Sequence, residues 1–340
     1  MQNKISFNRP KLYTNLLSDS ITGNTKQISV HSMVILDEFT LRTPDALLSG
    51  KATEEIIKNC CPEIIEPENL LICDIQQILA NIKIATTGMK VELLITCPKC
   101  SFQDPYEINL SSYINSLSAN KWFTPLIMND LIIYFSPPTY KQFNIFSIAD
   151  FKLRKQIYQI SKLNSIEGYE EILISLIAQQ KNLLYSFHSQ SINKIIISKS
   201  NNTVTSQYHI QEWFKQLDIQ SQNEISSYIA ESIKQCYLPN VEITCSKCQE
   251  QLSVPIDLDF CTQFRNKLIT AFESEIIEML EKMNSETKNI KAELLKLIWY
   301  MRGSISYSEA YYLTAFERES ISKIIQENIE TSKKFGMPII

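Results

Sequence analysis

Glycine and histidine are scarce in this chain, and their scarcity excludes several classes of site. Only 6 of the 340 residues are glycine, and none stands in a phosphate-cradling loop or a dinucleotide-binding fingerprint. The 3 histidines, His31, His188 and His209, lie far apart and outside any recognisable nucleophile and base spacing. The sequence therefore offers no catalytic or cofactor-binding residue, and we expect neither an enzyme nor a small-molecule substrate.

Long apolar runs and blocks of like charge are also missing. No run approaches the roughly twenty apolar residues that cross a bilayer, and the first ten residues lack the apolar core of a signal peptide. We therefore expect synthesis in a reducing cytoplasm and no membrane partner. The 33 basic and 37 acidic residues give a net charge of −4, so a nucleic-acid partner is not expected. Adjacent acids such as Asp37 and Glu38 are expected to be solvated or to cap helices.

Cysteine, by contrast, is well represented and regularly spaced. The chain has 9 cysteines, and two short segments, 91–100 and 241–248, are near copies that each end in Cys-x-x-Cys. The likeness continues beyond the cysteines, because Ile108 and Ile256 follow their pairs at the same distance. Each copy alternates as a strand does, turns at the thiols and returns as a strand, which is typical of a zinc knuckle.

The two knuckles together supply four sulfur ligands, Cys97, Cys100, Cys245 and Cys248. Four thiolates complete a closed tetrahedral site for a structural Zn²⁺ ion and leave no position for water or substrate. The segment between the pairs is far longer than the roughly 15–20 residues of an ordinary zinc ribbon. The sequence therefore predicts that the fold brings the two hairpins face to face in a pseudo-symmetric pair.

Three other interpretations of the cysteine pairs stay open. The pairs can be four reduced thiols in two β-turns, or two incomplete metal sites finished by other ligands. A redox pair normally opens a helix after a strand, whereas strand follows both pairs here. Cys236 and Cys261 lie close to the second pair and are possible spare ligands, although an isolated cysteine is usually a small buried residue. The remaining cysteines are Cys60, Cys61 and Cys73.

The apolar pattern predicts an α+β fold with paired β-hairpin knuckles at its centre, a mixed α/β middle region and a helical C-terminal region. We divide the chain into an N-terminal α+β region with the first hairpin (1–110), a middle α+β region (111–240), the second hairpin packed on the first (241–260) and the helical region (261–340).

Local signals place individual elements within these regions. Apolar residues at helical spacing predict a helix over 74–82, and a buried-type strand is expected at 131–135. Capping-box spacing predicts helix starts at Ser221, Ser306 and Thr314. In the last region the apolar residues between 264 and 280 form one helical stripe, and those between 294 and 299 form another. The short apolar tail after 335 is either a packed end or a peptide that docks on a partner.

The order of these elements resembles the baseplate hub protein family of T-even-type contractile-tailed bacteriophages. The resemblance spans nearly the whole chain and rests on the ordered set rather than on one motif. Its members are the acidic pair Asp37-Glu38, the Asp-led helix 74–82, the first Cys-Pro-x-Cys knuckle, the strand 131–135, Glu212-Trp213 with Leu217, the second knuckle with Ile-Asp-Leu-Asp-Phe at 256–260, and Trp299-Tyr300-Met301-Arg302-Gly303 before the Ser306 box.

The resemblance implies a non-enzymatic structural component of the virion tail baseplate, in the hub or next to it, that holds neighbouring tail proteins in register. Its partners would be other phage tail and baseplate proteins, and it would reach the virion after synthesis in the host cytoplasm. Two alternatives stay open. One is a tail assembly chaperone absent from the mature virion, and the other is a zinc-containing nucleic-acid-binding protein.

Overall fold

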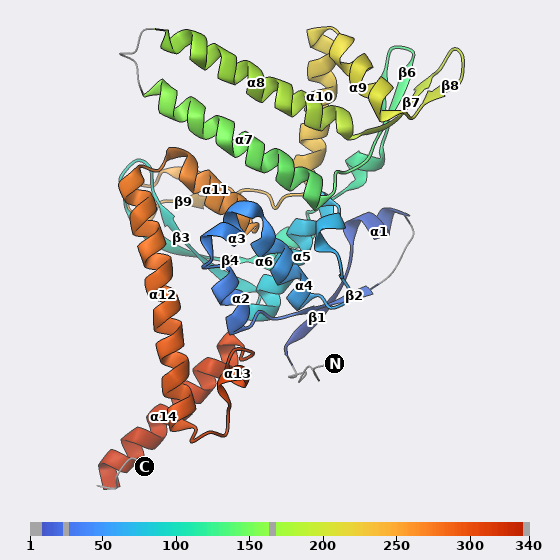
Figure 1. Cartoon of the computed structure of the whole chain (residues 1–340). Helices are drawn as coiled ribbons and strands as arrows, with labels where there is room; N and C mark the ends of the chain where they lie inside the picture. The colour runs from blue at the N-terminus through green and yellow to red at the C-terminus, as the bar shows by residue number, and fades with distance from the viewer. Residues whose placement is uncertain (1–8, 23–26, 163–167, 336–340) are drawn as a thin grey trace.

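The computed structural model describes residues 9–22, 27–162 and 168–335, and Figure 1 shows their arrangement. The fold is α+β, as the sequence predicts. Three two-stranded sheets and one four-stranded sheet, all antiparallel, stand among the helices of this part of the chain. The apolar tail at 336–340, for which a docking role was considered, lies outside the described residues.

The N-terminal part is built around one buried helix, α5 (Ile72–Thr87). The predicted helical stripe is confirmed, because Ile75, Ile78, Leu79 and Ile82 are all buried. Gly88 ends the helix with φ at 88°, a conformation that glycine adopts at little cost. The elements around α5 are β1 (Lys11–Asn15), α1 (Leu17–Thr22), β2 (Gln27–His31), α2 (Ile35–Thr40), α3 (Pro44–Ser49), α4 (Lys51–Cys60) and the short 3₁₀ helix η1 (Pro67–Asn69).

The middle part has its own sheet, and the apolar cluster packed against that sheet also includes Ile72 and Cys73 of α5. The strand order is β5-β6-β7-β8, and the predicted strand at 131–135 is β6. Thr139 begins α7 with a capping box to Gln142, and α7 and α8 form a long helical hairpin that projects from the body (Figure 1). The elements are η2 (Asn120–Phe123), β5 (Leu126–Met128), β6 (Leu131–Phe135), α7 (Tyr140–Ser161), α8 (Tyr169–Gln190), β7 (Ile192–Ile197), β8 (Asn202–Val204), α9 (Gln207–Gln216) and α10 (Ile219–Gln235).

The predicted start of α10 at Ser221 is wrong by one turn. Asp218 is the N-cap, and its carboxylate accepts hydrogen bonds from the Ser221 backbone N–H at 3.0 Å and from the Ser221 hydroxyl at 2.7 Å. An aspartate satisfies free N–H groups at a helix start as well as serine does. Ser221 therefore donates to the cap instead of being the cap.

Two β-hairpins cover one end of α5. The first consists of β3 (Lys90–Thr96) and β4 (Gln103–Asn109), followed by α6 (Leu110–Ile114), and the second of β9 (Val241–Thr244) and β10 (Gln251–Val254). Ile108 and Ile256, the matching residues of the repeat, are both buried in one apolar cluster with Ala80 and Ile84 of α5. The repeat in the sequence is therefore a repeat in packing.

The C-terminal region is helical, as predicted, but its helix boundaries differ. The stripe expected over 264–280 is interrupted, because α11 (Phe260–Thr270) ends before Phe272 and α12 (Glu273–Tyr300) begins after it. The Phe272 backbone is extended, and its N–H donates to the Glu275 carboxylate at 2.7 Å. The capping boxes predicted at Ser306 and Thr314 are confirmed, and they start α13 (Tyr307–Ala310) and α14 (Ala315–Phe335).

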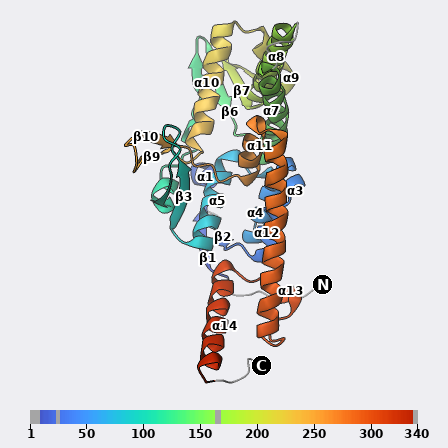
Figure 2. The ribbon, with the colours of Figure 1, turned by 90° about the vertical axis from the view of Figure 1, so that its left-hand side faces the viewer.

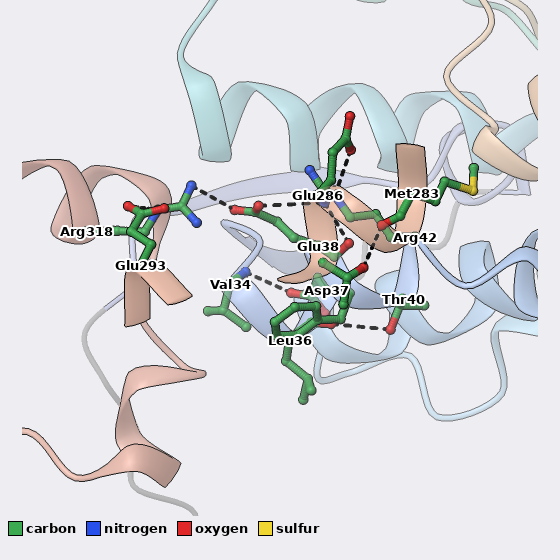
Figure 3. Close-up of polar contacts among 12 residues, drawn as sticks. Val34, Leu36, Asp37, Glu38, Thr40, Arg42, Met283, Glu286, Glu293 and Arg318 are labelled. Carbon is green, nitrogen blue, oxygen red and sulfur yellow. Dashed lines mark hydrogen bonds and ion pairs between the residues drawn. The ribbon is translucent and has the colours of Figure 1, made fainter. Parts of the chain in front are cut away.

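The C-terminal helices are fastened to the body at α2, as Figure 3 shows. Arg42 pairs with Glu286 of α12 at 3.0 Å, while Arg318 of α14 pairs with Glu38 at 3.4 Å and with Glu293 at 3.5 Å. Of the adjacent acids at 37 and 38, Asp37 caps the start of α2 by accepting the Val34 N–H at 2.9 Å. Glu38 instead joins α2 to α14 through its ion pair with Arg318. The sequence predicted a solvated or capping role for it and not this ion pair.

Candidate metal centre

The turn of the first hairpin presents two thiols on a tightly bonded backbone. The Cys97 N–H donates to the Phe102 carbonyl, and the Ser101 N–H donates to the Cys97 carbonyl, both at 2.9 Å. Ser101 has φ at 55°, in the left-handed region. These bonds aim the Cys97 and Cys100 side chains to the same side of the hairpin end, as a zinc knuckle requires.

The second hairpin repeats this geometry. The Cys245 N–H donates to the Glu250 carbonyl, and the Gln249 N–H donates to the Cys245 carbonyl, again at 2.9 Å. Gln249 has φ at 59°, matching Ser101. The likeness that the sequence shows at the cysteines is thus also a likeness in backbone conformation and hydrogen bonding.

The fold brings all four predicted residues together. Their sulfur atoms lie within 4.8 Å of one another, with 3.6 Å between Cys97 and Cys248 and 3.7 Å between Cys100 and Cys245. Sulfur atoms about 2.3 Å from a tetrahedral ion stand about 3.8 Å apart, whereas a disulfide bond is about 2.05 Å long. The four thiols are therefore spaced for a shared metal ion, and none of these cysteines is in a disulfide.

The two turns meet with approximate two-fold symmetry. Counted from the cysteines, Lys99 corresponds to Lys247 and Phe102 corresponds to Glu250. Lys99 pairs with the Glu250 carboxylate at 2.5 Å, and Lys247 lies 5.6 Å from the centre of the Phe102 ring. Each turn thus places its lysine against the same position of the other turn, which is the arrangement of an isologous interface.

Further hydrogen bonds hold the hairpins together away from the sulfurs. The Tyr106 hydroxyl donates to the Thr244 carbonyl at 3.1 Å, and the Ser246 hydroxyl donates to the Asp104 carboxylate. Each bond runs from one hairpin to the other. Because these contacts fix the relative position of the turns, they preorganise the four sulfurs for an ion.

The four thiols lie close together in a partly buried, mostly apolar site. Cys97 and Cys245 are buried, and Cys100 and Cys248 are half-buried, among apolar side chains that include Leu252. The backbone N–H groups of Cys248 and Lys247 lower the pKa of Cys245 to about 7, because a hydrogen bond to the thiolate stabilises the charged form. Loss of solvation and hydrogen bonds with the neighbouring sulfurs instead raise the pKa of Cys248 to about 12, so without an ion the cluster shares protons among its sulfurs. In the described part of the chain, no histidine or carboxylate joins the cluster.

The other cysteines are buried elsewhere. Cys236 donates to the carbonyls of Ser118 and Ser232, and Cys261 contacts the Thr53 hydroxyl. Burial raises the pKa of Cys61 to about 12 and that of Cys261 to about 11. The possible role of Cys236 and Cys261 as spare ligands is not supported, because neither belongs to the four-sulfur group.

Sequence reasoning missed a buried polar cluster directly after the second hairpin. Asp257 accepts a hydrogen bond from the Gln76 amide of α5 at 2.8 Å, and Asp259 accepts one from the Thr53 hydroxyl at 2.5 Å and one from the Tyr140 hydroxyl at 3.3 Å. Burial raises the pKa of Asp257 to about 6. These bonds tie the hairpin to three helices. Two acids alternating with apolar residues at 256–260 were the available signal.

The fully buried Arg265 extends this cluster. Its guanidinium donates to the Leu48 carbonyl and to the Asn144 side chain, both at 3.1 Å. The histidines lie outside both clusters. His188 is buried, and loss of solvation lowers its pKa to about 4, so it is neutral at physiological pH.

Residues 20–264 match the family whose description is T4 bacteriophage base plate protein. The match covers more than half of the chain and includes both hairpins, so this protein belongs to that family. It is a structural protein of a phage tail baseplate. No curated protein and no solved structure matches the chain. Among the described residues, no helix combines the length and apolar character needed to cross a membrane.

Proposed function

We propose that this protein is a hub or hub-adjacent subunit that holds neighbouring tail proteins together in the baseplate. A structural Zn²⁺ ion bound by Cys97, Cys100, Cys245 and Cys248 stabilises it. The observation that carries this proposal is the meeting of four sulfur atoms from two hairpins far apart in sequence. Such an ion makes the body of the protein a stiff fixture from which the helical regions reach partners.

The donor set selects zinc over the other common metals. Four thiolates are soft ligands that suit Zn²⁺, whereas Mg²⁺ and Ca²⁺ take oxygen ligands. A closed four-sulfur site leaves no position for a reacting water, so its role is structural. A zinc ion contributes on the order of 10 kcal/mol to folding of the element it closes. That contribution suits a part that bears load when the tail contracts.

Removing a ligand tests the metal site. We expect Cys97→Ser and Cys245→Ser to lower both the zinc content and the melting temperature, because three remaining thiolates bind the ion more weakly. The control is Cys236→Ala, which removes a buried thiol outside the cluster and should leave one zinc ion per chain. Metal content by mass spectrometry and unfolding by calorimetry give the result. Full zinc content in both serine variants would contradict the assignment.

The place of the protein in the phage needs a separate experiment. Quantitative mass spectrometry of purified phage particles should find it at a fixed copy number in a symmetric ratio to other baseplate proteins. An assembly chaperone would instead be present in infected cells and missing from finished particles. Cross-linking within intact baseplates, read by the same method, would then identify which neighbours it joins.

A further inference from the structure

The outer side chains of helix α12 are exposed, and one of them, Asn284, also borders a cleft lined by Phe39 and Arg42 of the body. Its inner face carries the buried residues Ile290, Leu294 and Leu297. The outer positions, which follow one another at steps of three or four residues and so share one face, are Ile277, Glu281, Asn284, Lys288, Ala292, Leu295 and Trp299. Figure 2 shows α12 running unobstructed along the face turned toward the viewer.

The exposed apolar side chains of this face lie toward its two ends. Ile277 is 50% exposed near the start of the helix, while Leu295 is 56% and Trp299 80% exposed near its end. Large exposed apolar and aromatic side chains on one face are typical of an interaction surface. The polar residues Asn284 and Lys288 occupy the middle.

The charges of α12 are divided in the same way. Its first ten residues contain four glutamates and one basic residue, Lys282. Its second half carries exposed lysines. The one acid of that second half, Glu293, is engaged by Arg318 of the same chain. The acidic residues are Glu273, Glu275, Glu278 and Glu281, and the lysines are Lys288, Lys291 and Lys296.

We infer that the outer face of α12 pairs antiparallel with the same face of a second copy of this chain. In that arrangement Ile277 of one copy packs between Leu295 and Trp299 of the other, at both ends of the interface. Glu278 and Lys296 flank the apolar stripe on the same side, so each meets its opposite charge on the partner. A parallel pair would place like charges together, and the antiparallel pair is the complementary one.

The proposed interface has one unfavourable position at its centre. The pairing is symmetric about the region of Lys288, so the two copies place these ammonium groups close together. Because like charges repel, Lys288→Gln should tighten association. A docking partner of another kind would not predict this gain, since the repulsion exists only between two copies of the chain.

Charge reversal gives a direct test on the full-length, zinc-loaded chain. In sedimentation velocity over a range of concentrations, wild type should show a reversible monomer–dimer equilibrium. Glu278→Lys and Lys296→Glu should each weaken it by about tenfold or more, because every dimer contains two such pairs. An equal mixture of the two variants should form heterodimers, and the double variant should dimerise again. Trp299→Ala should also weaken the dimer. Mixing Trp299→Ala with either charge-reversal variant should not recover wild-type association.

The control is Glu231→Lys, which reverses an exposed charge on α10 and should leave the equilibrium unchanged. Circular dichroism and zinc content should be unaffected by all of these surface changes, so this test is independent of the metal site. Wild type that stays monomeric at every concentration would overturn the inference. So would single reversals that fail to weaken the dimer, or a mixture of the two variants that fails to associate.

Discussion

Single residues decide how the second hairpin is joined to the body. Asp257 and Asp259 follow that hairpin directly and take hydrogen bonds from Gln76, Thr53 and Tyr140. A buried carboxylate without such donors would cost several kcal/mol, so these three partners explain how two acids are tolerated there. Their effect is to anchor the chain segment that carries half of the proposed zinc ligands.

Asp257 should give the stability of this protein a specific pH dependence. Its pKa in the folded state is raised to about 6 by burial, above the ordinary value of about 4. The group therefore contributes no penalty below pH 4, where it is protonated in both states, and it destabilises the fold as pH rises through 6. The free energy of unfolding of Asp257→Asn should therefore exceed that of wild type by an amount that grows between pH 4 and 7 and reaches up to about 3 kcal/mol.

Urea unfolding of wild type and Asp257→Asn at several pH values measures this gain as a difference of free energies. Asn keeps a side-chain oxygen that can accept from Gln76, so the variant changes charge with little change of shape. Titrating groups far from Asp257 are the same in both proteins and cancel in the comparison, whereas the repulsion between the Asp257 and Asp259 carboxylates is part of the measured difference. A difference that does not change with pH would show that Asp257 is not the responsible group.

At the scale of elements, the sequence predicted the patterns that lie within one helix or hairpin. It did not predict helix boundaries that depend on unusual caps. The stripe of α5 and the boxes at Ser306 and Thr314 follow from residue spacing alone. The break between α11 and α12 at Phe272 could not be predicted from spacing. A phenylalanine offers no capping side chain, and the stripe of apolar residues continues through it. The cap comes from Glu275, whose carboxylate reaches back to the Phe272 N–H.

The attachment of α14 is a testable property at the same scale. Arg318 joins α14 to Glu38 of α2 and to Glu293 of α12, and α14 has no buried residue of its own. Arg318→Met should therefore speed amide hydrogen exchange in α14 by about tenfold while leaving α5 unchanged. Lys323→Met, which removes an exposed pair within α14, is the matched control. Equal effects of the two variants would contradict this account.

For the whole molecule, the repeat was the most informative part of the sequence. The residues of each knuckle and the matching Ile108 and Ile256 indicated two like hairpins, and the structure brings them together on α5. The ionic junction at Arg42 and Arg318 was not predictable, since it joins residues distant in sequence with no shared pattern. The division of the chain at 110, 240 and 260 stays a prediction.

Figures 1 and 2 show a central body from which several helices project in different directions. The hairpin pair lies at one side of the body, the α7–α8 hairpin projects at one end, and α12 and α14 extend at the other. A rigid centre transmits force between such arms only if the two hairpins stay joined. In this account the zinc ion keeps them joined, supported by the bonds of Tyr106 and Ser246.

X-ray absorption at the zinc edge of the purified full-length protein tests this central claim most directly. The account predicts one zinc ion per chain with four sulfur neighbours at about 2.3 Å and no nitrogen or oxygen ligand. Protein that binds no zinc, or a zinc shell with fewer than four sulfur atoms, would contradict it.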